Sequence, residues 1–369
     1  MVTINDVAKR AGVSPVTVSR VVNNSDYVSR ATRQKVEKAI DELGYIPSFM
    51  ARGLRLNKTF TLALILPDIT NVFWTTVARG VEDAAMRNNY SILVYNVDED
   101  EQKQKRAIEV VLSQQVDGVM IAPHNRNVKN LSKLIQNNTP TIILDRKLDE
   151  GKLDWHFDYV RDDSISGAFA LTEHLINLGH QRIAMVSGNL HTSTAQDRVI
   201  GYQRALEKHG LRFDESIIRY GEYKVEAGES MTRELFDSDA EFTSIFAANN
   251  AIGMGVVREL LRRDFRIPED YSVVFYDDYS NASSYFPFFT VVMQDPYRIG
   301  KIAAERLFER ISEPDLPCRT EIFPSELIVR YSCGARMDEK GESPMSLPVL
   351  SHAVLAENKR MIQPFTKEV

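Results

Sequence analysis

The sequence has 369 residues, of which 43% are hydrophobic and 26% are charged. A chain of this size buries more than one core, so we expect a small domain followed by one or two larger α/β domains. No segment approaches the roughly 18 consecutive apolar residues of a membrane span. Cys318 and Cys333 have neither CxxC spacing nor a nearby histidine cluster, so we expect no metal site and no disulfide framework.

Charge is divided unevenly along the chain. Residues 1–59 contain ten Lys and Arg against five Asp and Glu, a net +5, so the rest of the chain carries −11 to give the overall −6. This asymmetry predicts a basic head that contacts phosphates and an acidic body that does not. The N-terminus lacks the pattern of a signal peptide, so we expect a cytoplasmic protein.

The first 22 residues predict two short helices joined by a tight turn. Apolar residues recur at helical spacing over 4–11, with Thr3 placed to cap the first turn and Gly12 placed to end the last. Ser14 can cap a second helix that has Pro15 at its first position. Two short helices joined by a turn of about three residues that contains Gly are typical of the helix-turn-helix unit.

The second of these helices has the side chains that DNA recognition requires. Val16, Thr17, Ser19 and Arg20 face outward, and the three smaller side chains can approach base edges while Arg20 can donate two hydrogen bonds to guanine. A third helix, over about residues 29–44, would close a three-helix core.

From residue 61 onward, apolar runs alternate with helical stretches. This order predicts two α/β lobes, each with a doubly wound parallel sheet that is covered by helices on both faces. Ligands of such sheets bind beyond the carboxyl ends of the strands. The polar and aromatic residues that follow the apolar runs are Asn71, Phe73, Trp74, Asp145, Arg146, Tyr223 and Asp277. Nothing predicts an enzyme, since the GxSxG, GxxxxGK[ST] and GxGxxG motifs are absent.

The chain resembles the LacI/GalR family of bacterial transcription regulators. The resemblance rests on TINDVAKRAGVS, TVSRVVN, ATRQKVEKAIDELGYIPS and ARGL near the N-terminus, and on NLGHQRIAMVSG, DRVIGYQRAL, RIPEDYSVVFYDD and FFTVVMQDPYRIGKIAAERL further on. It implies a helix-turn-helix domain over residues 1–46, a hinge helix and linker over 47–58, and a two-lobed core of the periplasmic-binding-protein type over 59–336. The chain would cross between the lobes near 160, 290 and 322, and we expect a loose tail over 337–369.

The resemblance also assigns roles to individual residues. Leu54 takes the position of the hinge leucine that enters the minor groove, where an apolar wedge bends the duplex. The predicted DNA contacts are Thr3, Ser14, Pro15, Val16, Thr17, Ser19, Arg20, Asn23, Arg52 and Leu54.

For the effector site, the resemblance points to Arg198 as the main polar contact and to Asp277 as a hydrogen-bond acceptor. The predicted effector contacts are Asn71, Phe73, Trp74, Asp145, Arg146, Thr194, Arg198, Tyr223 and Asp277. The alternatives are that the aromatic pair packs within a lobe and that Asp145 and Arg146 form a salt bridge with each other. Thr192 replaces an arginine found in some relatives, and Asn250 replaces a common Asp, so we give Asn250 little weight.

We therefore expect a homodimeric, ligand-responsive repressor of a carbohydrate operon. It would bind palindromic operator DNA and respond to a sugar or sugar derivative between the lobes. The alternative is a purine or another non-sugar co-repressor, because a purine would also stack on Phe73 and Trp74. A solute-binding transport protein would have the same lobes but no helix-turn-helix. No cofactor is expected.

Overall fold

The computed structural model describes residues 2–22, 27–46, 58–149, 157–278 and 287–335. They belong to two compact units, residues 1–60 and 61–369, which we describe separately. The predicted hinge helix, up to residue 57, and the predicted tail, from residue 337, lie outside the described residues.

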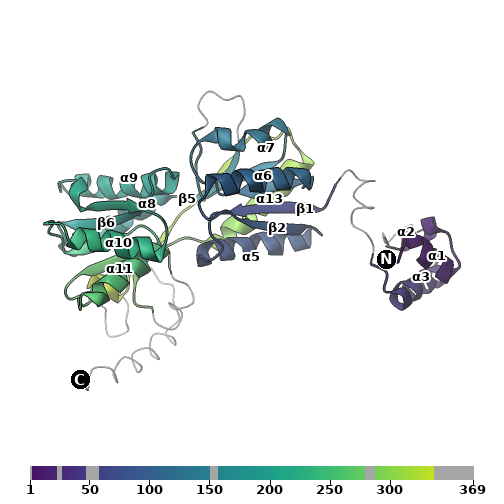
Figure 1. Cartoon of the computed structure of the whole chain (residues 1–369), viewed down its shortest axis with the longest axis horizontal. Coiled ribbons are helices and arrows are strands. Elements are labelled where there is room, and N and C mark those ends of the chain that lie inside the picture. Colours follow the sequence, from purple (N-terminus) through teal and green to yellow (C-terminus); the bar gives the residue numbers. More distant parts are fainter. Residues whose placement is uncertain (1, 23–26, 47–57, 150–156, 279–286, 336–369) are drawn as a thin grey trace, which may run out of the picture. The chain divides into compact units, whose positions relative to one another are not determined.

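The described part of the first unit contains α1 (Ile4–Ala11), α2 (Pro15–Val22) and α3 (Arg30–Leu43) (Figure 1). Helix α1 begins with a capping box, in which Thr3 and Asp6 exchange side-chain to backbone hydrogen bonds, and it ends at Gly12 with φ of 67°. The three helices share one small core, whose buried side chains are Val7, Ala8, Val18, Val21, Val36 and Ala39. The apolar spacing predicted this arrangement.

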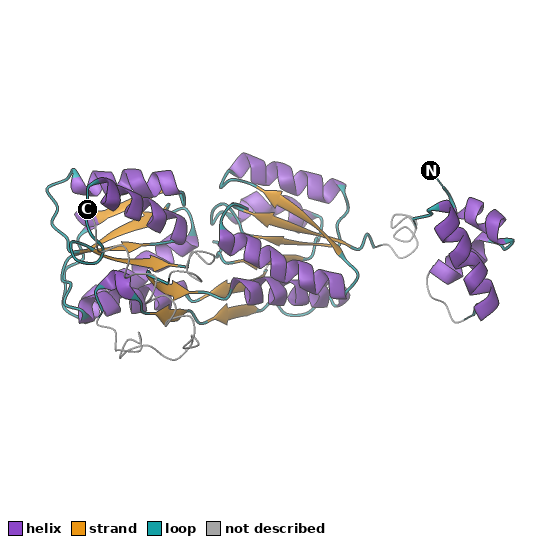
Figure 2. Ribbon diagram, turned by 90° about the horizontal axis from the view of Figure 1, so that it is seen from below, coloured by secondary structure: helices purple, strands orange, loops and turns teal. Residues whose placement is uncertain are grey.

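The second unit contains two lobes, each built on a six-stranded sheet covered by helices (Figures 1 and 2). The first sheet has the order β11-β5-β4-β3-β1-β2, and all of its pairs are parallel. The second sheet has the order β12-β10-β9-β8-β6-β7, and only the β10–β12 pair is antiparallel. The first-sheet strands are β1 (Thr61–Leu66), β2 (Ser91–Asn96), β3 (Gly118–Ile121), β4 (Thr141–Leu144), β5 (Asp158–Asp162) and β11 (Thr320–Phe323). The second-sheet strands are β6 (Ile183–Gly188), β7 (Ile218–Gly221), β8 (Ser244–Ala247), β9 (Ser272–Tyr276), β10 (Thr290–Met293) and β12 (Glu326–Ile328).

Long helices pack in pairs on the sheets. The helices of the first lobe are α5 (Val72–Arg87), α6 (Glu101–Ser113), α7 (Ser132–Gln136) and α13 (Pro296–Ser312). Those of the second lobe are α8 (Ser164–Asn177), α9 (Ser193–Lys208), α10 (Val225–Phe236) and α11 (Asn250–Arg262). Short 3₁₀ turns occur at η1 (Val128–Leu131), η2 (Glu215–Ile217) and η3 (Tyr331–Cys333).

Helices α5 and α13 cross at two glycines. A Cβ atom on Gly80 would lie 2.1 Å from the carbonyl oxygen of Tyr297, and one on Gly300 would lie 2.0 Å from that of Val77. Neither position therefore accepts a larger residue without separating the helices. This crossing fixes α13, which enters the first lobe late in the chain, against the first helix of that lobe.

The chain passes between the lobes three times, first after β5. Strand β10 belongs to the second sheet, so the return to the first lobe comes after Met293. Strand β11 belongs to the first sheet, so the final crossing follows Phe323. Strand β5 was not expected, because the sequence Asp158–Asp162 (DYVRD) has no apolar run.

Candidate effector site and DNA-binding head

The helix-turn-helix presents the predicted recognition face. The Ser14 side chain accepts a hydrogen bond from the backbone N–H of Thr17 at 3.2 Å, and so caps α2. Val16, at 60% exposure, and Arg20 are both exposed, and Ser19 is half-buried. An exposed apolar side chain in the first turn of a short helix, with an exposed arginine one turn further on, suits contact with base edges, so the role predicted for α2 stays a prediction with suitable geometry.

The remaining predicted DNA contacts divide into two groups. Thr3 and Pro15 are exposed, and the Thr3 side chain donates a hydrogen bond to the Asp6 carboxylate at 2.7 Å within the capping box. Asn23, Arg52 and Leu54 lie outside the described residues.

In the second unit, Arg198 contacts residues at the ends of β8 and β9, in the predicted effector site. Its Nη1 donates to the carbonyl oxygen of Ala248 at 2.5 Å, and its Nη2 lies 3.9 Å from a carboxylate oxygen of Asp277. The guanidinium also stacks on the Tyr276 ring, with 3.8 Å between the guanidinium carbon and the ring centroid. The whole residue is only 4% exposed.

Three buried carboxylates surround this arginine, and they come from both lobes. Asp145 follows β4 and Asp162 ends β5 in the first lobe, whereas Asp277 follows β9 in the second. The hydroxyl of Tyr276 donates to Asp162 across the lobes at 2.6 Å. The three carboxylates therefore share one buried region with Arg198. Its contact with Asp277 is longer than a direct hydrogen bond.

The pKa values of these carboxylates reflect that crowding. Burial, with the charge of Asp162 as the next contribution, raises the pKa of Asp145 to about 6 against the opposing effect of Arg198 and Arg146. Burial raises the pKa of Asp277 to about 7 against the opposing effect of Arg198, and the charges of Asp162 and Asp145 contribute to the rise. Carboxyl groups with raised pKa values in a shared buried site are candidates for ligand binding.

Several polar atoms in this region have no hydrogen-bond partner. They are Oδ1 of Asp145, Nε of Arg198 and Oε1 of Gln294, whose amide Nε2 donates to Asp277 at 2.7 Å. An unpartnered buried polar atom is costly, so such a group is explained when a ligand or water completes it. Asp145 after β4 and Gln294 after β10 thus each have an acceptor oxygen without a donor, and Arg198 on α9 has an N–H without an acceptor.

Thr194 and Tyr223 lie together in the second lobe. The Tyr223 hydroxyl is 3.4 Å from the Thr194 hydroxyl and 3.3 Å from that of Thr192, which caps α9. A Cβ atom on Gly188 would collide with the Tyr223 ring at 2.0 Å, so the glycine at the end of β6 allows the ring to lie there.

The aromatic pair after β1 differs from expectation. Phe73 and Trp74 are 7% and 6% exposed, and both belong to the hydrophobic core of the first lobe. Their rings meet edge to face, with centroids 4.9 Å apart and planes at 86°. The expectation that this pair is not core is wrong, because α5 begins at Val72 and turns both rings inward. Contact with an effector stays a prediction for them.

The guanidinium fork of Arg146 is already occupied, and its contact with an effector stays a prediction. It donates to both carboxylate oxygens of Glu99 and to the carbonyl oxygen of Pro123, and it does not form the salt bridge with Asp145 that the alternative supposed. The residue is 3% exposed. Arg146 therefore ties together the loops that follow β2, β3 and β4, and it holds the neighbouring Asp145 in place.

Asn71 makes a contact that connects the lobes. Its Nδ2 donates to Asn250 Oδ1 at 3.0 Å, and Asn250 Nδ2 donates back to Asn71 Oδ1 at 3.2 Å. Lys147 adds an ion pair to Asp197 at 2.6 Å and a backbone hydrogen bond to Ser193 at 2.7 Å. Asn250 was given little weight from the sequence, and Lys147 was not singled out, although both follow predicted strands.

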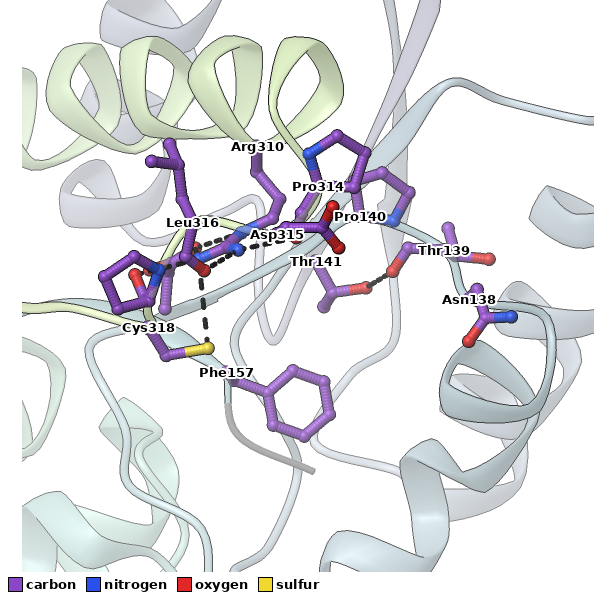
Figure 3. A pocket seen from close by; sticks show the side chains of 12 residues that line it. Asn138, Thr139, Pro140, Thr141, Phe157, Arg310, Pro314, Asp315, Leu316 and Cys318 are labelled. Carbon is purple, nitrogen blue, oxygen red and sulfur yellow. Dashed lines mark hydrogen bonds and ion pairs between the residues drawn. The ribbon is translucent and has the colours of Figure 1, made fainter. Parts of the chain in front are cut away.

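A separate cavity of about 490 Å³ lies at the other end of the first sheet, where β4 and β5 begin (Figure 3). Asp158 pairs there with Arg310 at 2.9 Å, and Arg310 also donates to the carbonyl oxygens of Pro314 and Pro317. Arg310 thus organises the loop that precedes β11. The cavity lies at the opposite end of the strands from the effector residues, so it is not an extension of the effector site.

Neither a membrane-spanning helix nor a metal-binding cluster is found within the ranges that the structure describes. None of the described helices combines the length and apolar character needed to traverse a bilayer. Within the same ranges, no cluster of three or more His, Cys, Asp or Glu side chains is arranged to hold a metal ion.

A helix-turn-helix head joined to a two-lobed binding domain, with buried polar groups converging between the lobes, defines a ligand-responsive DNA-binding regulator. Comparison with known proteins agrees. The model of the lacI family of bacterial regulatory proteins matches residues 3–48, and that of the periplasmic binding proteins and sugar binding domain of the LacI family matches residues 59–329. The chain belongs to the LacI family.

Curated relatives match over most of their length. The chain is 34% identical to the HTH-type transcriptional repressor PurR of Vibrio atlanticus, over 89% of this chain and 98% of that protein. It is also 34% identical to the ribose operon repressor of Escherichia coli, over 86% of this chain and 95% of that protein.

Solved structures give the same result. The lac repressor dimer bound to operator and the anti-inducer ONPF has a TM-score of 0.79 at 27% identity, covering 90% of this chain and 99% of that one. The complex of the transcriptional regulator CelR with cellobiose has a TM-score of 0.68 at 31% identity, covering 90% and 100%.

Proposed function

We propose that this protein represses a carbohydrate operon as a homodimer and that a sugar or sugar derivative, bound between the lobes, controls its affinity for operator DNA. The observation that carries the proposal is the group of unpartnered buried atoms on Asp145, Arg198 and Gln294. A polyhydroxylated ring has donors and acceptors around its whole edge. It can therefore donate to the Asp145 and Gln294 oxygens and accept from the Arg198 N–H at once.

The effector residues in this proposal are Asn71, Phe73, Trp74, Asp145, Thr194, Arg198, Tyr223 and Asp277. Arg146 acts by positioning Asp145. The DNA contacts are those of α2 together with Thr3 and the hinge residues named above. We further propose that the protein binds and releases its ligand without chemical change, because the relatives named above are repressors.

Control of DNA binding follows from linkage between the two sites. An effector that binds one arrangement of the lobes more tightly shifts the population toward it, and the operator affinity changes by the difference in binding free energy. The reciprocal effect must be equal, so operator DNA must change the effector affinity by the same factor. The Asn71–Asn250 pair and the Lys147–Asp197 ion pair belong to the arrangement seen here.

A purine effector is the alternative. It would need a flat apolar face for stacking, and the perpendicular, buried rings of Phe73 and Trp74 do not form two parallel walls. The geometry therefore favours a sugar.

The experiment has two stages. A palindromic operator is first selected from a random DNA library with the full-length chain. Operator affinity is then measured by fluorescence anisotropy at fixed salt, with and without pentoses, hexoses, disaccharides, hypoxanthine and guanine. We expect one sugar to change the operator affinity by about 5- to 150-fold, the usual range of allosteric coupling. A response to a purine and to no sugar would contradict the proposal.

A further inference from the structure

The charges around the effector site are unbalanced, and this imbalance bears on the kind of sugar that can bind. Asp145, Asp162 and Asp277 are 8%, 1% and 8% exposed and face one another through the buried region around Arg198. Against three carboxylates, Arg198 supplies one positive charge. The other nearby cations are already neutralised, since Arg146 is paired with Glu99 and Lys147 with Asp197.

Arg198 is also poorly placed to receive an anion. A carboxylate or phosphate is bound best by both nitrogens of the guanidinium fork. In this protein, Nη1 donates to Ala248, Nη2 lies 3.9 Å from Asp277, and one face of the group stacks on Tyr276. Nε has no hydrogen-bond partner, and the contact of Nη2 with Asp277 is longer than a hydrogen bond. These N–H groups suit neutral hydroxyl oxygens, because an anion beside Nη2 would approach the like charge of the Asp277 carboxylate.

The helix ends at the cleft do not supply the missing positive potential. Helices α5, α9 and α11 all begin there, and the N-terminus of a helix attracts anions when its N–H groups are free. Each of these helices is already capped by its own preceding residue: Asn71 accepts from Phe73, Thr192 from Ala195 and Asn249 from Ile252. Thr192 itself is uncharged and hydrogen-bonded to Tyr223.

We infer that this site is selective for uncharged, hydroxyl-rich sugars and excludes their phosphorylated and carboxylated derivatives. The inference rests on the proposed sugar-responsive function and narrows its ligand class. A neutral sugar completes the unpartnered atoms of Asp145, Arg198 and Gln294 without adding charge. A sugar acid or sugar phosphate places a further negative charge among three carboxylates in a region of low dielectric, where repulsion is only weakly screened.

The test uses matched pairs of sugars on the full-length protein. Binding is measured by calorimetry for D-glucose with D-glucuronate, D-galactose with D-galacturonate and D-ribose with D-ribose 5-phosphate, and hypoxanthine and guanine are included. We expect at least one neutral sugar to bind and its anionic partner to bind at least about a hundredfold more weakly, because each tenfold factor corresponds to only about 1.4 kcal/mol.

Charge and shape are separated by two isosteric variants. Asp145→Asn and Asp277→Asn each remove a negative charge with little change in volume. We expect each to lower the ratio of anion to neutral dissociation constants by about tenfold, whatever it does to the affinity for the neutral sugar itself. Asp239→Asn, at an exposed carboxylate of the second lobe, removes the same charge far from the site and leaves the ratio unchanged.

A pH series on the unmodified protein gives an independent measurement if a variant folds poorly. Uronates stay ionised between pH 8 and 5.5, whereas Asp145 and Asp277 take up protons over this range, with pKa values of about 6 and 7. The discrimination against glucuronate or galacturonate should therefore weaken as the pH falls.

The outcomes are distinct. An anionic member that binds as tightly as its neutral partner, or more tightly, overturns this inference and leaves the sugar-responsive function intact. The inference is also overturned if neither the two variants nor pH changes the ratio of anion to neutral dissociation constants. The site would then discriminate by ligand shape and not by charge. Binding of a purine alone, or of nothing in the panel, overturns the proposed sugar effector itself.

Discussion

Asn71 and Asn250 exchange two side-chain hydrogen bonds, of 3.0 and 3.2 Å, although 179 positions separate them in the sequence. The pair joins the first residue before α5 to the first residue of α11, so it connects the two lobes directly. Asn250 also donates to the backbone carbonyl of Asp278 at 3.3 Å.

Breaking this pair should loosen the contact between the lobes. A neutral hydrogen bond contributes about 0.5–1.5 kcal/mol, so Asn250→Ala should lower the unfolding free energy of the core by about 1–3 kcal/mol in urea titrations. Asn250→Asp keeps the acceptor for Asn71 but places a buried carboxylate oxygen against the oxygens of Asn71 and Asp278, so it should destabilise the core at least as much. Equal stability of the Ala variant and the unmodified protein would show that the pair contributes nothing.

Arg20 is predicted to read a base pair. Arg20→Ala should lose about 1–3 kcal/mol of binding free energy at one base pair of each operator half-site and should relax specificity there. Lys35→Ala, on the exposed face of α3, serves as the comparison, because a phosphate contact weakens binding to all sequences alike. Affinities for single-base operator variants distinguish the two. Uniform weakening by Arg20→Ala would make Arg20 a phosphate contact.

Glu99 should stabilise the wall of the effector site through Arg146. Glu99→Gln leaves a guanidinium that is 3% exposed without its carboxylate. Because the Glu99 side chain is itself 22% exposed and water can partly replace it, we expect a loss of about 2–3 kcal/mol, below the range for a fully buried pair. The control Glu109→Gln breaks the exposed pair with Lys133 and should leave the urea midpoint unchanged.

His174 should make the stability of the second lobe depend on pH. It is buried with Nε2 3.2 Å from the Cys333 sulfur, and burial lowers its pKa from 6.5 to about 4. The neutral form is thus favoured in the folded state, so this contribution is complete above pH 6.5 and is lost as the pH falls toward 4.

Two carboxyl groups act in the opposite direction over the same pH range. The raised pKa values of Asp145 and Asp277 stabilise the fold as the pH falls. The informative quantity is therefore the stability difference between the unmodified protein and His174→Gln, measured by urea unfolding from pH 7.5 to 4.5. It should change by about 2–3 kcal/mol in favour of the variant at low pH. A flat difference would contradict the assignment.

Much of this architecture could be predicted from the sequence, because apolar spacing and strand–helix alternation are local signals. The capping residues Thr3 and Gly12 and the polar residues that follow β4 and β9 were found in this way. Strand β5 was missed, since its alternating polar residues resemble a loop. Asp158 and Asp162 are tolerated inside the sheet because they are hydrogen-bonded, among others by Arg310 and Tyr276 from distant segments.

The same limit applies at the effector site. Arg146 was expected to contact a ligand, and its partner Glu99, 47 positions earlier in the loop after β2, could not be identified from the sequence. Phe73 and Trp74 were expected to line the site because they follow the first apolar run, but α5 begins at Val72 and both rings join the core. Asn250 was given little weight on family pattern alone, and its partner could be identified only once the lobes were placed together.

Operator binding by Arg198→Ala, with and without the effector, tests the central claim most directly. Arg204→Ala, at an exposed position of the same helix, is the control. If the effector is an inducer, Arg198→Ala should bind operator nearly normally and no longer respond. If it is a co-repressor, the variant should fail to bind operator at any effector concentration. A variant that binds operator and still responds with unchanged effector affinity would remove Arg198 from the site and contradict the account.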